Sequence, residues 1–192
     1  MLTGGGALVG FHLHHRTSDD LDLFAKPPVQ LDEGYRALEA AAVALGGSVE
    51  SVRSSPEFRR ALVRRGNEAA IVDLVVDRAA DVDETVAGPE RIRLHSLREI
   101  AANKVCALLG RGEIRDLIDL RAILARGLSL QDILVDAEQK DGGVEPATLA
   151  WILAGLRIGA DVELPGVTAA ELEEFRRNLV VRLRALAKPT DD

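Results

Sequence analysis

The chain has 192 residues, of which 47% are hydrophobic and 3% aromatic, and its formal net charge is −7. This composition excludes wholesale disorder and suits one medium domain or two small ones, with a core built from Leu, Val, Ile and Ala. The acidic total argues against a large surface that binds nucleic acid non-specifically. It does not exclude a local basic groove, because the arginines are clustered. No run approaches the ~20 apolar residues of a membrane span, and the first residues do not resemble a signal peptide. We therefore expect a cytoplasmic protein.

The first half of the chain predicts mixed strands and helices. Alternation of Asp and Leu indicates a strand, an Ala-rich segment ended by two glycines indicates a helix, and Gly66-Asn67 between two apolar runs indicates a β-hairpin. The expected elements, in chain order, are a glycine-rich turn at 4–6, a strand at 20–23, a helix at 35–45 and a hairpin with arms 58–65 and 68–77.

From Ser96 onward the pattern changes to helix after helix. Ser96 with Glu99, and Thr168 with Glu171, each have the spacing of a capping box at a helix start. The organisation predicted is an α/β part, residues 1–94, followed by a helical part, residues 95–192. The expected helices run over 96–110, 113–126, from Ser129, from Pro146 past Trp151, and over 168–186.

Three aspartates suggest a metal site. Asp20 and Asp22 lie two residues apart on the expected strand, so their carboxylates share one face roughly 7 Å apart, while Leu21 and Leu23 are expected to face the core. Asp73 interrupts an apolar strand, where a buried carboxylate is costly without a cation or a partner. Such carboxylates suit Mg²⁺ or Mn²⁺ with substrate phosphates as further ligands, and three of them predict a two-metal site. The alternatives are a wet, acidic strand face and an edge position for Asp73.

Three further features each allow two interpretations. The segment Gly4–Gly6 fits close approach to a phosphate, or only a tight turn. Lys104 lies in the apolar stripe of its helix, so it either extends to solvent or provides a positive charge for a nucleotide triphosphate. Asp116 and Asp119 lie near one helix face, where pairing with arginines on a solvated surface is the simpler role. Cys106 is expected to be a buried, inert thiol.

Two motifs resemble the AbiEii-type nucleotidyltransferases. The first runs from Leu2 to Phe24 and contains Gly-Gly-Gly-Ala-Leu, then His-Arg-Thr-Ser-Asp-Asp-Leu-Asp-Leu. The second joins Ser-Leu-Arg-Glu-Ile at 96–100 to Lys104 and to Arg-Asp-Leu-Ile-Asp-Leu at 115–120. The similarity spans about residues 2–125. This family includes abortive-infection toxins and related mycobacterial toxins that modify transfer RNA, and it shares the DNA polymerase β-like nucleotidyltransferase fold.

The resemblance implies an α/β nucleotidyltransferase fold, with a small mixed sheet and helices followed by a helical half that completes the active site. It implies transfer of a nucleoside monophosphate from an NTP to a hydroxyl acceptor, with RNA such as a transfer RNA as the acceptor and a cognate antitoxin as a partner. Asp20 and Asp22 are implied as metal ligands, joined by Asp73, while Lys104 and Asp116 complete the catalytic set. The residues implied at the nucleotide are Gly4, Gly5, Gly6, Ser18, Lys104 and Asp119.

This chain departs from the family pattern at Gly6, where relatives often carry Thr or Ser, so a hydroxyl contact to a phosphate is lost. It also begins almost on its first strand, whereas such proteins usually have helices upstream, so two alternatives stay open: an earlier native start, or a pocket that is more open than usual. Two rival functions stay open. One is a nucleotidyltransferase that acts on a small molecule such as an aminoglycoside. The other is a non-catalytic relative that binds a nucleotide or a partner protein, in which the aspartates do not converge.

Arginines are concentrated in two segments, the hairpin and the last helix. A local basic groove for RNA is one interpretation of these clusters, and ordinary surface solubility is the other. The arginines concerned are Arg59, Arg60, Arg64 and Arg65 on the hairpin, and Arg176, Arg177, Arg182 and Arg184 on the last helix.

Overall fold

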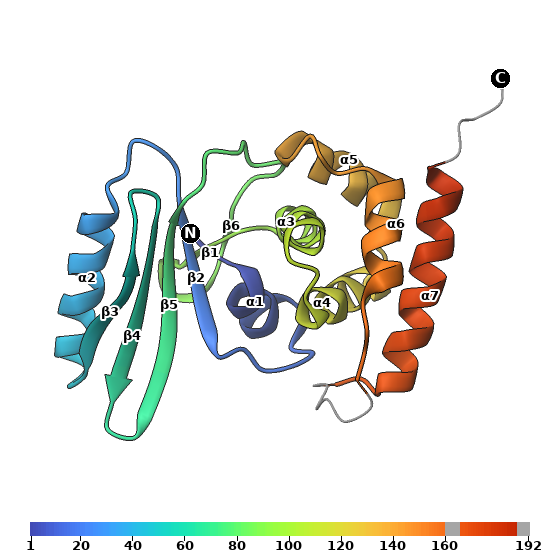
Figure 1. Ribbon diagram of the computed structural model, residues 1–192. Helices are drawn as coiled ribbons and strands as arrows, with labels where there is room; N and C mark the ends of the chain where they lie inside the picture. Colours follow the sequence, from blue (N-terminus) through green and yellow to red (C-terminus); the bar gives the residue numbers. More distant parts are fainter. Residues whose placement is uncertain (160–165, 188–192) are drawn as a thin grey trace. The chain divides into compact units, whose positions relative to one another are not determined.

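The computed structural model describes residues 1–159 and 166–187 (Figure 1). Its contacts divide the chain into two compact units. The first unit consists of Met1–Ala79 and Thr85–His95, and the second consists of Ala80–Glu84 and the residues from Ser96 onward. None of the described helices is long and apolar enough to cross a membrane.

The first unit contains a mixed sheet of seven strands in the order β3-β4-β5-β2-β1-β7-β6. β2 runs parallel to β5 and β1 runs parallel to β7, while the remaining neighbours are antiparallel. The expected small mixed sheet is confirmed, and so is the hairpin through Gly66-Asn67. The strands are β1 (Leu2–Thr3), β2 (Asp20–Ala25), β3 (Ser48–Ser54), β4 (Phe58–Arg65), β5 (Glu68–Val76), β6 (Val86–Ala87) and β7 (Arg93–Leu94).

Helices lie on both sides of this sheet. Figure 1 shows α2 (Leu31–Ala44) and α1 (Gly4–Ala7) on opposite sides of the strands. α1 continues into the π-helical segment η1 (Leu8–Leu13), so the expected glycine turn is in fact the first turn of a helix. A short 3-10 helix, η2 (Pro89–Arg91), precedes the last strand.

The apolar core on the α2 side is built by Leu31, Val72 and Leu74, with Leu23 packed against it. Leu23 therefore takes part in the core as expected. The same expectation is wrong for Leu21, which is 42% exposed. Leu21 lies near the start of β2, where a Cβ built on Gly6 would come within 3.0 Å of its Cδ2 atom, and it is not part of the core cluster.

The second unit is a bundle of helices. Figure 1 shows α3 surrounded by α4, α5 and α6, with α7 beside α6. The capping box of Thr168 with Glu171 is confirmed in full. At Ser96 the predicted N-cap is confirmed, because its side chain accepts from the Glu99 amide, but the Glu99 side chain accepts from the Val82 amide and no reciprocal bond of a capping box is formed. The helices are α3 (Leu97–Gly110), α4 (Ile114–Ala125), α5 (Leu130–Lys140), α6 (Pro146–Gly155) and α7 (Ala169–Leu186).

Candidate functional site

A row of polar residues crosses the sheet of the first unit. Thr3 on β1 lies opposite Asp22 on β2, and Asp22 lies opposite Asp73 on β5. Asp73 in turn lies opposite Arg60 on β4. Residues in register on neighbouring strands point to the same face of a sheet, so two carboxylates from distant parts of the chain are brought together.

The Asp22 carboxylate lies directly against Gly4. Gly4 has a φ of +61°, and a Cβ atom built on it would lie 2.0 Å from Asp22 Oδ2. Both the backbone conformation and the space therefore require glycine at this position. Because Gly4 begins a helix, backbone N–H groups and the positive end of the helix dipole also face this region, an arrangement suited to phosphate.

Gly5 and Gly6 also allow close approaches, although less close than at Gly4. A Cβ on Gly5 would lie 2.9 Å from both Arg16 Nη2 and Ser18 Oγ, and a Cβ on Gly6 would lie 3.2 Å from the Asp20 carbonyl oxygen. Ser18 Oγ donates a hydrogen bond to Asp20 Oδ1 at 2.8 Å, which orients that carboxylate. The three glycines thus let the first turn of α1 pack tightly against β2 and the segment that leads into it.

Asp73 forms an ion pair with Arg60. Its two oxygens accept hydrogen bonds from Arg60, Nε to Oδ1 at 2.8 Å and Nη2 to Oδ2 at 2.7 Å, and the residue is only 5% exposed. The hydrogen bond to Asp73 raises the pKa of Arg60; burial lowers it, and the charges of Asp73, Asp20 and Asp22 raise it further. In the part of the chain that the structure describes, the carboxylate oxygens of Asp20, Asp22 and Asp73 do not all lie within 4.8 Å of one another. A metal role for Asp73 stays a prediction.

The donors at Asp20 and Asp22 nevertheless fit a hard divalent cation. Both side chains are partly exposed on β2, the central strand of the sheet, and Asp20 is already oriented by Ser18. Mg²⁺ typically takes one or two carboxylates and completes its coordination with water and substrate phosphates. The adjoining helix start at Gly4 supplies a place where those phosphates are favoured.

In the second unit, Lys104 is buried in an ionic cluster. Its Nζ atom lies 2.9 Å from Asp116 Oδ1 and 2.7 Å from Asp119 Oδ2, and the residue is 7% exposed. Arg111 also donates to Asp116, with its Nε atom 2.9 Å from Oδ2. Burial tends to lower the pKa of Lys104, but Asp119 and Asp116 outweigh it and the pKa is raised.

This cluster corrects two expectations. Lys104 does not extend to solvent, and Asp116 and Asp119 are fully buried rather than on a solvated surface. The cause is the packing of α3 on α4, which places the apolar stripe that contains Lys104 against the start of α4. The cluster accounts for all three residues structurally, and their part in nucleotide binding stays a prediction.

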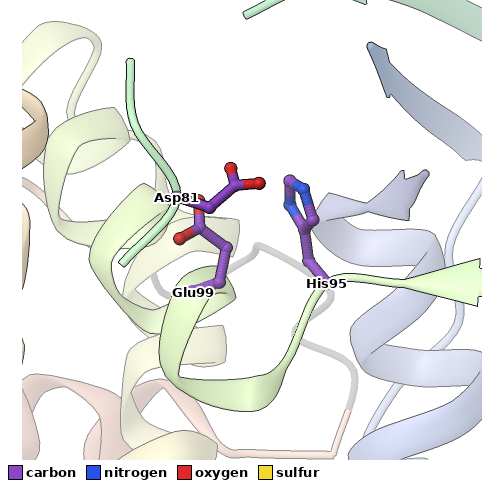
Figure 2. Close-up of side chains that lie close together, drawn as sticks. All are labelled: Asp81, His95 and Glu99. Carbon is purple, nitrogen blue, oxygen red and sulfur yellow. The ribbon is translucent and has the colours of Figure 1, made fainter. Parts of the chain in front are cut away.

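Figure 2 shows another set of polar side chains, Asp81, His95 and Glu99. Within the second unit, Glu99 Oε2 accepts from the Val82 amide and Glu99 Oε1 lies 2.5 Å from Lys140 Nζ. Within the first unit, His95 Nδ1 lies 2.9 Å from Thr3 Oγ1. These hydrogen bonds inside each unit offset part of the cost of burying His95 and Glu99. No local sequence pattern predicts either set of contacts.

The hairpin arginines do not form one groove. Arg59 lies over the Tyr35 ring at 4.2 Å and pairs with Asp32 on the α2 side, and Arg65 pairs with Glu68. Side chains alternate along a strand, so Arg60 and Arg64 lie on the opposite face. On the last helix, Arg176 pairs with Glu173 and donates to the Leu153 carbonyl, which ties α7 to α6.

Comparison with known proteins assigns the chain to a family. The profile described as nucleotidyl transferase AbiEii toxin, Type IV TA system, matches residues 1–187. The chain belongs to this family. As a member of the AbiEii family, the protein is a toxin nucleotidyltransferase. The resemblance seen in its two motifs is confirmed.

Solved structures support the fold. MenT4, a nucleotidyltransferase toxin from Mycobacterium tuberculosis, matches with a TM-score of 0.60 and 16% identity, over 100% of this chain and 76% of that one. A chain from H. pylori described as a nucleotidyltransferase matches with a TM-score of 0.56 and 22% identity, over 98% of this chain and 89% of that one. No curated protein matches the sequence. At these identities the two structures show that the AbiEii family chain has a nucleotidyltransferase fold.

Proposed function

We propose that the protein transfers a nucleoside monophosphate from an NTP to a hydroxyl group of RNA in a reaction that depends on a divalent metal ion. The observation that carries the proposal is the contact between the Asp22 carboxylate and Gly4 at the start of α1. The contact supports the proposal because a carboxylate suited to a divalent cation lies next to a helix start, a position that favours phosphate. In this proposal Asp20 and Asp22 hold the ion, and Gly4 and Gly5 line the triphosphate pocket.

The chemistry requires little beyond positioning and charge compensation. The acceptor hydroxyl gives up its proton to water, its oxygen bonds to the α-phosphorus, and the bond between that phosphorus and the pyrophosphate oxygen breaks, so pyrophosphate leaves. Magnesium, when bound, compensates negative charge on the phosphates and on the leaving group. Ser18 keeps the Asp20 carboxylate oriented, and the backbone amides of the first turn of α1 offer hydrogen bonds to phosphate oxygens.

Support for RNA as the acceptor comes from family membership and from Arg60 and Arg64, which lie on the face of β4 opposite α2. A toxin function also favours a cognate antitoxin as a partner. The cytoplasm, where NTPs and RNA are found together, is the compartment this function needs.

A labelling experiment tests the proposal. The purified protein is incubated with each α-³²P-labelled NTP, MgCl₂ and total RNA, and the RNA is separated on a denaturing gel. We expect label in RNA with one or a few NTPs, release of pyrophosphate, and loss of both with EDTA. Label on a small-molecule acceptor in place of RNA contradicts the RNA assignment, and no transfer to any acceptor contradicts the enzyme proposal for this site.

A further inference from the structure

We propose that the face of β3 and β4 opposite α2 is a stacking platform for an unpaired nucleobase of the acceptor. The platform consists of Arg53, Phe58 and Arg60. This inference rests on the RNA acceptor proposed above and identifies the part of that acceptor which the protein holds. Its geometry, its charge and its position relative to Asp22 each support it.

The three side chains form a layered arrangement. The Arg53 Cζ atom lies 5.7 Å from the centroid of the Phe58 ring, and the Arg60 Cζ atom lies 5.8 Å from it. Arg53 on β3 lies opposite Arg60 on β4, and Phe58 precedes Arg60 by two residues, so all three share one face of the sheet. Two guanidinium planes and an aromatic ring on a sheet face provide flat surfaces for stacking.

The charge of this face is only partly compensated. Arg60 pairs with Asp73, whereas Arg53 and Arg64 form no ion pair within residues 1–159 and 166–187. Both residues are exposed on the face that carries Phe58. Glu50, opposite Leu62, is the acidic residue that β3 contributes to this face. In a chain with a net charge of −7, two arginines without acidic partners indicate a negatively charged ligand here.

The platform lies at a useful distance from the proposed metal ligands. Arg60 is in register with Asp73, and Asp73 is in register with Asp22. β4 is two strand spacings from β2 and β3 is three, so the platform lies roughly 10–14 Å from Asp22. This position suits a nucleotide close to the one whose hydroxyl reacts.

The chemistry of the platform selects single-stranded nucleic acid. Proteins hold unpaired bases by stacking them on aromatic rings and on arginine guanidinium planes, with further arginines at the phosphates. In a duplex the base faces are already stacked on one another and are not available. An acidic peptide satisfies the charge of Arg53 and Arg64 but offers no flat group to Phe58, so RNA accounts for more of the site.

The test measures RNA binding directly, without NTP. Fluorescence anisotropy is recorded with a labelled single-stranded RNA of about 12 nucleotides, within the range such sites cover. Phe58→Leu keeps the apolar bulk but removes the ring, and we expect affinity to fall at least about fivefold. Phe58→Tyr keeps a ring and should bind like wild type. Arg53→Gln should weaken binding and reduce the salt dependence by about one phosphate contact.

Arg65→Gln is the matched control, because Arg65 lies on the same hairpin, faces the other side of the sheet and changes the charge equally. Its affinity should stay within about twofold of wild type, since its charge is screened from the platform face. Melting temperatures of all variants establish that each one is folded. Arg60 is left intact, because its removal leaves buried Asp73 without a partner.

Three results overturn the platform: no binding of single-stranded RNA by wild type, equal binding by Phe58→Leu and wild type, or a duplex of equal length binding as tightly. Tight binding of an acidic polyglutamate peptide that depends on Arg53, without binding of RNA, assigns the face to a protein partner and also overturns it. The labelling experiment separates these results from the proposed function. If wild type labels RNA and Phe58→Leu does so with unchanged KM, the transferase proposal stands and the platform fails.

Discussion

The Asp22 carboxylate fills the space that a side chain on residue 4 requires, since a Cβ on Gly4 would lie 2.0 Å from Asp22 Oδ2. Gly4 also has a φ of +61°, which disfavours any other residue. Two residues that are distant in sequence are thereby matched to each other. The start of α1 and Asp22 on β2 therefore form one preformed structure.

We expect Gly4→Ala to lose activity more than stability. The methyl group displaces Asp22 and the left-handed backbone conformation costs about 1–3 kcal/mol. A displacement of about 1 Å at a catalytic group costs on the order of 10²-fold in rate. Gly10→Ala is the control, because a Cβ there meets nothing within 4 Å. Transfer rates and unfolding free energies of both variants give the comparison, and an active Gly4→Ala protein contradicts the proposed pocket.

A second prediction concerns Asp22 as a metal ligand. Asp22→Asn keeps the size of the side chain but removes its charge, so transfer should fall about 10²-fold or more at intact melting temperature. Asp19→Asn is the matched control, because Asp19 is exposed and lies just before β2. Transfer is measured as a function of Mg²⁺ concentration. Equal rates for the Asp22 variant and wild type at every concentration would falsify the assignment.

Local patterns made much of this structure predictable. The spacing of Asp20 and Asp22 placed both on one strand, Gly66-Asn67 marked a hairpin, and Ser96 and Thr168 marked two helix starts as N-caps. Each of these features depends on residues a few positions apart. Local chemistry is therefore enough to predict them.

Other features depend on register and packing that no local pattern contains. β3 is exposed along nearly its whole length and lacks alternating apolar residues, so an edge strand was not expected there. The pairing of Asp73 with Arg60 follows from the alignment of β4 and β5. The Gly4–Gly6 segment looked like a turn because glycine disfavours helices, but close packing against Asp20 and Asp22 overrides that preference.

A third prediction concerns Lys104. Extension to solvent, one of the two interpretations that the sequence left open, would make Lys104 replaceable by Met at little cost. The structure predicts the opposite, because Lys104→Met leaves Asp119 without the ammonium that lies 2.7 Å from it in a fully buried position. Removal of one partner from a buried ion pair typically costs about 3–5 kcal/mol. Urea denaturation of Lys104→Met should show a loss of this size, and Lys104→Met/Asp119→Leu should recover much of it.

The pH dependence of that loss has a defined sign. The folded-state pKa of Lys104 is raised above its ordinary value of 10.5, so the stabilisation is complete below pH 10.5 and decreases as the pH rises through the folded-state pKa. The difference in unfolding free energy between wild type and Lys104→Met should therefore be constant from pH 7 to pH 10 and should shrink at higher pH. A difference that already shrinks between pH 7 and pH 9 contradicts a charged, paired Lys104.

The last prediction concerns Cys106, the single cysteine of the chain. It is half-buried on α3, its Sγ atom lies 3.6 Å from the Ala137 carbonyl oxygen, and burial raises its pKa from 9.0 to about 11. The thiolate is the reactive form, so alkylation by iodoacetamide should be slow at pH 8 and should rise with an inflection near pH 11. In concentrated urea the inflection should move down to about pH 8.5, the value of an exposed thiol. Because there is one thiol, mass spectrometry of the intact chain counts the reaction directly. A native inflection close to the urea value means that Cys106 is accessible, and it contradicts the packing of α3 against α5 around this residue.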